Sequence, residues 1–225
     1  RRTGVITSST RHPLSMVGPM GLPNFAVVDV ETSGLNVRRH RLLQLAVITV
    51  DAQGEVLDEW DSYITLRWPL GRVGPTHIHG ITRPRLKQAP KINTVLDELS
   101  QRIGDTHFVA HNARFDGEFL VNAARRSNLQ SRDLVRFERR LCTLRMSRRL
   151  DPDRLQSHRL GDLCDRYGVS LVRPHEARSD ALATAAILPH LLRAHEVTDL
   201  ADLDPFLDRP DAGHRRTSAG FSTRR

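Results

Sequence analysis

The sequence is poor in cysteine, in aromatic residues and in long apolar runs, and each shortage excludes a class of protein. The 225-residue chain has only two cysteines, Cys142 and Cys164. They form neither a CxxC zinc motif nor a disulfide framework, so a reduced, cytoplasmic setting is expected. No apolar run approaches the roughly 18 residues that span a bilayer. Aromatic residues make up 5% of the chain, too few for the broad base-stacking surface of many single-strand binders.

Lysine is also nearly absent, whereas arginine is abundant. Of the 34 basic residues only Lys87 and Lys91 are lysines, and the formal net charge is +8. A basic chain suits a polyanionic partner such as nucleic acid, although many other proteins are basic as well. Residues 125–149 hold nine arginines and are the expected strand-binding surface. The alternative interpretation is a solvated helical face in an arginine-biased protein.

Composition divides the chain into a central domain and two tails. Residues 1–22 mix Arg, Ser, Thr, Pro and Gly without periodicity and contain no apolar stretch like a secretion signal, which predicts a flexible N-terminal tail. Residues 196–225 combine acids and arginines and end in Gly, Ser, Thr and Arg, which predicts a flexible C-terminal tail. Residues 23–195 remain as one domain of ordinary size.

Within this domain the pattern predicts strands first and helices later. Short apolar runs indicate strands, and apolar residues at helical spacing indicate helices. Three consecutive strands followed by alternating helix and strand are typical of an α/β fold with a mixed sheet flanked by helices. The expected strands are 25–30, 41–50, 56–66 and 108–110, and the expected helices lie around 92–99, 115–123, 158–167 and 181–192.

Four carboxylates occupy positions where the expected elements begin or end. Asp29 and Glu31 end the first strand and point to the same face, because strand side chains alternate. Two acids on an apolar strand are unusual, since buried charges are costly unless they are paired or bind a metal. Asp116 follows the strand at 108–110, and Asp180 opens the last helix, five residues after His175. Taken singly, the acids are better explained as solvated strand-end or first-turn residues.

Taken together, the four acids indicate a particular chemistry. Clustered carboxylates suit hard divalent cations such as Mg²⁺ or Mn²⁺. Two such ions can stabilise both the attacking and the leaving oxygen in phosphodiester hydrolysis. A histidine is the natural base for the attacking water, because the unperturbed pKa of its side chain is about 6.5.

Four short motifs follow one another in a specific order. They read FAVVDVETSGL at 25–35, HGIT at 79–82, HNARFD at 111–116 and HEARSDA at 175–181. Their combination resembles the DnaQ-like exonuclease family, and in particular its DEDDh subgroup, which includes the proofreading subunits of bacterial replicative DNA polymerases. The resemblance extends over residues 23–195.

The resemblance implies an RNase H-like fold with a mixed, mainly five-stranded sheet. It also implies that Asp29, Glu31, Asp116 and Asp180 hold two Mg²⁺ or Mn²⁺ ions, and that His175 is the general base. All five catalytic positions are filled by the expected residue types, which argues against an inactive homologue.

The resemblance further implies how the substrate is held. The backbone from Thr32 through Ser33 and Gly34 to Leu35 would grip the terminal nucleotide, with Leu35 packing on its base, and Asn112 would also contact the substrate. Many relatives have Thr where this chain has Val30. Because its side chain is expected on the opposite face of the strand, the difference should have little catalytic consequence.

The expected activity is therefore 3′→5′ exonucleolytic cleavage of DNA with single-stranded or frayed ends, in proofreading, repair or end-trimming. A 3′→5′ exoribonuclease of the same fold, a non-catalytic polymerase-associated nucleic-acid-binding module and a hydrolase of free nucleotides remain open. The partners implied are a nucleic acid, DNA or RNA, and a DNA polymerase or another replication or repair protein. Neither expected tail matches a recognisable polymerase-binding segment.

Overall fold

Three antiparallel strands begin the fold, as the sequence predicts. In the computed structural model, residues 21–66, 71–127, 137 and 139–208 are described. Strand β1 (Phe25–Thr32) pairs with β2 (Leu42–Val50), which pairs with β3 (Val56–Tyr63). All nine residues of β2 are buried, because this strand lies inside the sheet with both faces covered. The short apolar runs in the sequence reflect this burial.

The other half of the sheet is built from parallel pairs and one short antiparallel strand. Strand β4 (His107–Ala110) runs parallel to β1, and β5 (Arg140–Cys142) runs parallel to β4. Strand β6 (Leu207–Asp208) pairs with β5 in the antiparallel direction, which gives the order β3-β2-β1-β4-β5-β6. The α/β, RNase H-like fold is confirmed. The sheet has six strands instead of five because a two-residue strand leaves no periodicity to detect.

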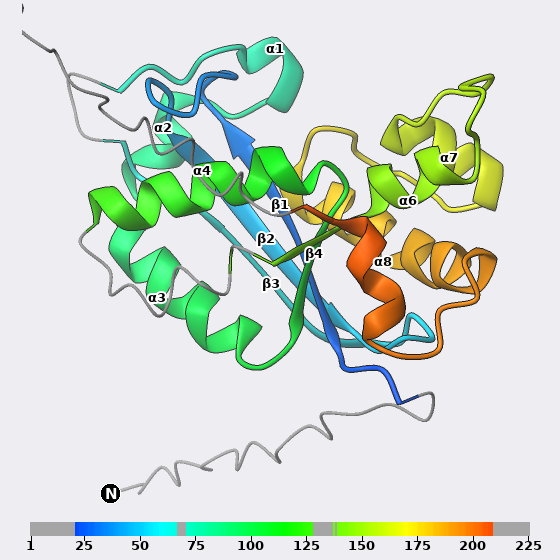
Figure 1. Cartoon of the computed structure of the whole chain (residues 1–225). Coiled ribbons are helices and arrows are strands. Elements are labelled where there is room, and N and C mark those ends of the chain that lie inside the picture. The colour runs from blue at the N-terminus through cyan, green and yellow to red at the C-terminus, as the bar shows by residue number, and fades with distance from the viewer. Residues whose placement is uncertain (1–20, 67–70, 128–136, 138, 209–225) are drawn as a thin grey trace, which may run out of the picture.

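Helices cover both faces of this sheet (Figure 1). Helix α8 (Ala177–Ala194) packs on one face, and α3 (Ile92–Ile103) and α4 (Ala113–Arg126) pack on the other, in front of the sheet in Figure 1. Helix α7 (Leu160–Tyr167) lies against α8 and ends at Gly168 in the left-handed conformation, as the sequence predicts. Among the described segments, no helix combines the length and apolar character needed to cross a membrane.

The alternating residues of β1 divide the core in two. Phe25 and Val27 belong to the cluster that contains α8, whereas Ala26, Val28 and Val30 belong to the cluster that contains α3 and α4. Val30 therefore points away from the α8 face, as expected. The odd-numbered positions that follow on the α8 face are the two acids of the first motif.

Several short elements escape sequence-based prediction. Helices α1 (Thr76–His79), α2 (Arg83–Lys87) and α6 (Thr143–Arg149) have four to seven residues, and a 3₁₀ helix η1 spans Ala201–Phe206. Elements of one or two turns bury few side chains, so their apolar spacing is no clearer than chance.

The structure corrects the boundary expected for the C-terminal tail. Val197, Leu203, Phe206 and Leu207 are buried, so the segment from residue 196 to 208 is part of the domain. Its acids conceal this from sequence analysis, because they dominate the composition while a few apolar residues make the contacts. The remainder of that tail, residues 209–225, and residues 1–20 of the N-terminal tail lie outside the described residues.

Candidate active site

The carboxyl end of β1 presents two acids toward α8. Asp29 and Glu31 alternate with residues that pack in the opposite core cluster, so both face the helix that carries Asp180. Both side chains are only partly buried, because the strand ends there and the apolar layer stops at Val27. The sheet thus places two half-buried carboxylates at its rim.

Helix α4 brings a third acid to the same strand. Asp116 lies in the first turn of the helix, is 4% exposed and accepts a hydrogen bond from the backbone N–H of Val30, at 3.2 Å from nitrogen to Oδ1. This bond joins the start of α4 to the end of β1. Asn112 occupies the helix N-cap position but makes no side-chain capping bond, and it is exposed. An Asn at the N-cap usually caps the helix with its side chain, but the side chain of Asn112 does not.

The fourth acid comes from the start of α8, close to the expected base. Asp180 Oδ2 accepts a hydrogen bond from the backbone N–H of His175 at 3.1 Å. His175 has a left-handed backbone with φ 64°, which turns the chain sharply before the helix. Potential ligand atoms of Glu31, His175 and Asp180 all lie within 4.8 Å of one another.

Crowding raises the pKa of every carboxyl in this cluster. Loss of hydration is the largest cause in each case, and repulsion from neighbouring carboxylates adds to it. The pKa of Glu31 rises to about 8, that of Asp116 to about 7 and that of Asp180 to about 6. The pKa of Asp29 also rises well above its ordinary value, with contributions from the other three acids. The four acids therefore form one interacting group.

This group fits divalent cations on chemical grounds. All four side chains offer oxygen, which Mg²⁺ and Mn²⁺ prefer. Asp180 Oδ1 is buried and finds no hydrogen-bond partner among the described residues. This oxygen therefore has lone pairs available for a cation. Four carboxyls with raised pKa values are unfavourable as a bare anionic cluster, and positive charge placed among them would relieve their repulsion.

A hydrogen bond and a close ring contact fix the shape of the turn after β1. Thr32 Oγ1 donates a hydrogen bond to the carbonyl oxygen of Gly34 at 2.9 Å. Gly34 has φ +148°, and a Cβ built on it would lie 2.7 Å from the ring of His40. Only glycine fits between this ring and the turn. Leu35 stands at the tip of the turn with 83% of its surface exposed, free to contact a ligand.

Ser33 is held in place by two hydrogen bonds to Arg41. Its backbone N–H donates to the carbonyl of Arg41, and its hydroxyl accepts from the backbone N–H of Arg41, both at 2.9 Å. A Cβ at Gly74 would overlap the backbone of Ser33, so the two chains run in direct contact. The expected nucleotide-holding segment therefore has a fixed shape.

The structure thus brings the ten predicted site residues to one edge of the sheet. Asp29, Glu31, Asp116 and Asp180 interact electrostatically, and His175 is bonded to Asp180. The turn at residues 32–35 continues β1, and Asn112 follows β4, the parallel neighbour of β1. Carboxyl ends of parallel strands meet at one edge.

His79 is a site residue that the sequence singles out only as part of a secondary motif. Its Nδ1 accepts a hydrogen bond from the backbone N–H of Ile81 at 3.0 Å, and its buried Nε2 has no partner among the described residues. Burial lowers the pKa of His79, and the charges of His77 and His175 contribute. Its proximity to His175 places the HGIT motif beside the acidic cluster.

Two of the described arginines in the stretch at 125–149 have structural roles. Arg140 is 1% exposed and lies opposite Asp208, so it is structural. Arg126 donates hydrogen bonds to the carbonyls of Val37 and His40, which holds the loop after the β1 turn. Residues 128–136 and 138 lie outside the described residues. Among the other described arginines of the stretch, Arg125, Arg139, Arg145, Arg148 and Arg149 are exposed.

Comparison with known proteins places the chain among nucleases. A family model described as exonuclease, RNase_T, matches residues 26–188. The PolC-type DNA polymerase III of Streptococcus pneumoniae strain D39 is 36% identical over 193 residues, and that of Bacillus subtilis strain 168 is 32% identical over 173 residues. These matches cover 84% and 75% of this chain but only 13% and 11% of the polymerases.

Solved structures agree on the fold. E. coli Exonuclease I in complex with a dT13 oligonucleotide superposes with a TM-score of 0.65 at 22% identity, over 75% of this chain and 41% of that one. The nuclease domain of 3′hExo, a DEDDh family member bound to rAMP, gives 0.64 at 14% identity, over 76% and 92%. Because the exonuclease model matches residues 26–188, most of the chain, this chain belongs to the RNase_T exonuclease family.

Proposed function

We propose that the protein is a metal-dependent 3′→5′ exonuclease that shortens DNA strands from single-stranded or frayed 3′ ends. The observation that carries this proposal is the coupled cluster of four carboxyls with raised pKa values beside His175. In the reaction, water attacks the last phosphodiester phosphorus and the bond to the preceding 3′ oxygen breaks. A nucleoside 5′-monophosphate leaves, and the strand keeps a 3′ hydroxyl.

The four carboxylates would hold two divalent cations, Mg²⁺ or Mn²⁺. When bound, such ions stabilise the attacking and the leaving oxygen of the phosphodiester. Asp116, fixed by its bond from Val30, and Asp180, fixed by its bond from His175, orient their carboxylates before any ligand arrives. Preorganised ligands cost little rearrangement during the reaction.

His175 would act as the general base. Its side chain is exposed at the mouth of the cluster, and its ring lies within 4.8 Å of Glu31 and Asp180 ligand atoms. A neutral imidazole there can accept the proton of the attacking water.

The braced turn would hold the 3′-terminal nucleotide. Thr32 and Ser33 are fixed by backbone-directed hydrogen bonds, and Gly34 allows the backbone to come close to a ligand. Leu35 would pack on the base, since it is exposed at the tip. Asn112, with its amide unused in capping, would contact the substrate from the other side.

The proposed partner beyond nucleic acid is the DNA replication or repair apparatus. The curated relatives reported above are named DNA polymerase III PolC-type, and the chain spans about an eighth of their length. The similarity therefore supports the nuclease chemistry and leaves the assembly in which it works as a proposal.

The test is cleavage of matched 5′-labelled DNA and RNA oligonucleotides with Mg²⁺, Mn²⁺ or EDTA. We expect a ladder that shortens from the 3′ end of DNA, requires metal and is absent with Asp180→Ala. Asp97→Ala, which removes an exposed acid from α3, is the matched control and should cleave normally. Cleavage of RNA alone would assign the protein as an exoribonuclease, and binding without cleavage would assign a non-catalytic module.

A further inference from the structure

Beside the acidic rim lies a groove of about 590 Å³ lined by arginines. It is formed by the start of α4, by α6, by the loop that follows α6 and by the end of η1. One acid, Asp208, is the only carboxylate among the described lining residues. The groove carries five guanidinium groups, those of Arg114, Arg145, Arg148, Arg149 and Arg154. Of these, Arg114 is paired with Glu118 on its own helix, at 3.0 Å.

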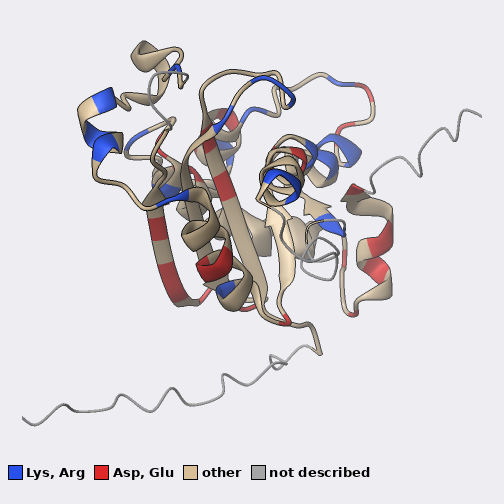
Figure 2. Cartoon of the chain, turned by 90° about the vertical axis from the view of Figure 1, so that its left-hand side faces the viewer, with Lys and Arg blue, Asp and Glu red and all other residues tan. Residues whose placement is uncertain are grey.

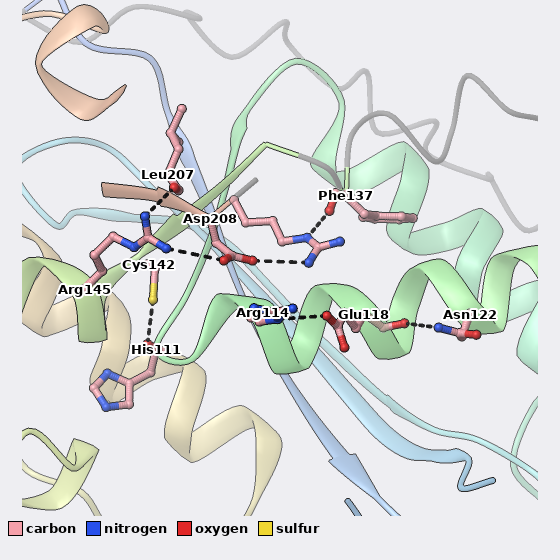
Figure 3. Close-up of polar contacts among 10 residues, drawn as sticks. His111, Arg114, Glu118, Asn122, Phe137, Cys142, Arg145, Leu207 and Asp208 are labelled. Atoms are coloured by element: carbon pink, nitrogen blue, oxygen red, sulfur yellow. Dashed lines mark hydrogen bonds and ion pairs between the residues drawn. The ribbon is translucent and has the colours of Figure 1, made fainter. Parts of the chain in front are cut away.

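The single acid does not neutralise this charge. Asp208 is shared between the buried Arg140, at 3.5 Å, and the groove residue Arg145, at 3.6 Å (Figure 3). Two arginines thus already face one carboxylate. Within the described part of the chain, Arg148 and Arg154 form no ion pair and are exposed. Figure 2 shows most Lys and Arg segments in the upper half of the view, whereas Asp and Glu segments are spread over both halves.

The wall of the groove is held by a buried histidine pair. His111, two residues before α4, hydrogen-bonds Thr143 of α6 through Nδ1 and the carbonyl of His158 through Nε2, both at 3.0 Å. Burial lowers the pKa of His111 to about 4, so it stays neutral and uses both nitrogens for structure. His158 Nδ1 hydrogen-bonds Ser147 of α6 at 2.8 Å. These bonds tie α4, α6 and the following loop together.

The same network fixes the loop that carries Arg154. Asp151 accepts hydrogen bonds from the backbone N–H groups of Leu155 and Gln156 and contacts Nε2 of His158 at 3.2 Å. Arg154 adopts a left-handed backbone with φ 55°, a conformation that a residue with a side chain keeps only when its surroundings hold it. The arginine is therefore presented by a fixed loop.

The groove begins where the acidic rim ends. Asn112 lines the groove, and Asp116 of the acidic cluster lies one helical turn further along α4. Arg114, between them in sequence, also lines the groove. A strand whose 3′ nucleotide sits at the acids therefore has a short path from Asn112 into the groove.

We propose that this arginine groove binds the phosphodiester backbone of the substrate strand on the 5′ side of the cleaved bond. Guanidinium groups match phosphate oxygens in geometry and charge. Phosphate contacts hold a strand without reading its sequence, which suits an enzyme that must move along any strand. The inference rests on the proposed exonuclease function, to which it adds the track of the substrate.

The experiment measures binding separately from cleavage. Fluorescence anisotropy of a 5′-labelled dinucleotide and of a DNA strand of about twelve nucleotides, in EDTA over a NaCl series, compares the full chain with the double variant Arg148→Gln, Arg154→Gln. We expect the variant to bind the long strand roughly tenfold more weakly at low salt and to lower the salt slope by about 1.4, about 0.7 for each lost phosphate contact. The loss should be smaller for the dinucleotide, which is too short to fill the groove.

Arg193→Gln is the matched control, because this exposed arginine lies in the last turn of α8, at the far end of that helix from Asp180. It should bind like the wild type, and thermal melting should report intact folding for both variants. An unchanged slope in the folded double variant, or wild-type protein that binds no DNA, overturns the groove proposal. Absence of cleavage in Mg²⁺ with binding still dependent on Arg148 and Arg154 would instead overturn the exonuclease proposal alone.

Discussion

Asp180 combines two roles at the scale of a single residue. Its carboxyl joins the acidic cluster, and it also accepts the hydrogen bond from the backbone N–H of His175. Asp180→Asn keeps the shape of the side chain but removes the negative charge that a cation needs. We expect its cleavage rate to fall by more than the roughly 10–100-fold that follows from losing a partner behind a metal ligand. Steady-state rates on a labelled DNA strand check this.

Although Asp180→Asn should lower the cleavage rate, it should not lower the thermal stability of the metal-free protein. Because crowding raises the pKa of each acid, removing one charge relieves repulsion in the metal-free protein. The melting temperature in EDTA should therefore stay equal to or rise above that of the wild type, while Asp97→Asn on α3 leaves it unchanged. A variant that is both active and destabilised would mean that Asp180 is a structural residue.

His175 gives a second prediction at this scale. If its imidazole accepts the proton of the attacking water, His175→Gln should lower the turnover number by about 10²–10⁴-fold with little change in KM. The wild-type rate should fall in acid, since a protonated imidazole accepts no proton. The variant should lose this dependence while it still requires Mg²⁺ or Mn²⁺. A pH–rate profile of the two proteins, measured at saturating metal, distinguishes the base from a residue that only packs.

At the scale of an element, the turn after β1 depends on one glycine. Gly34→Ala would place a methyl group against the His40 ring at a backbone φ of +148°, a conformation that costs an L-residue about 1–3 kcal/mol. The turn should shift and the KM for a DNA strand should rise. Gly161→Ala is the control, because nothing lies within 4 Å of a Cβ at this position of α7 and alanine favours a helix. Equal KM values for the two variants would show that the turn does not hold the nucleotide.

Elements also decide how much could be predicted from sequence. Strand β1 and helix α8 were predictable, because each has a run of apolar residues with an acid at one end. The motifs at 25–35 and 111–116 made it possible to predict the β1 turn, Asn112 and Asp116 as site residues. Strand β6 was not predictable, because its two residues, Leu207 and Asp208, carry no pattern and the role of Asp208 depends on Arg140, far away in sequence. The expected surface at residues 125–149 includes Arg145, Arg148 and Arg149 of the arginine groove. Arg114 and Arg154 were not predictable, because the groove joins residues from several separate elements.

The whole molecule should respond to pH through the acidic cluster. The pKa values of Asp180, Asp116 and Glu31 are raised to about 6, 7 and 8, whereas unfolded carboxyls titrate near their ordinary values of about 4. Between about pH 4, where the unfolded carboxyls titrate, and about pH 6 to 8, where the folded ones do, the folded chain binds more protons than the unfolded chain. The contribution of these groups to stability is therefore fully present below about pH 4 and is lost as pH rises through about 6 to 8.

Divalent cations should reverse this trend. They bind the deprotonated cluster of the folded chain and so stabilise it by mass action, increasingly as pH rises. In EDTA the melting temperature should fall between pH 5.5 and 8.5, by about 2–4 °C for each kcal/mol lost, and Mg²⁺ or Mn²⁺ should restore it mainly at the upper end. Calorimetry of the wild type and Asp180→Asn, with and without metal, separates the cluster from the other acids of the chain. If both proteins show the same pH dependence and the same response to metal, the raised carboxyl pKa values do not govern stability and the cluster is not a cation site.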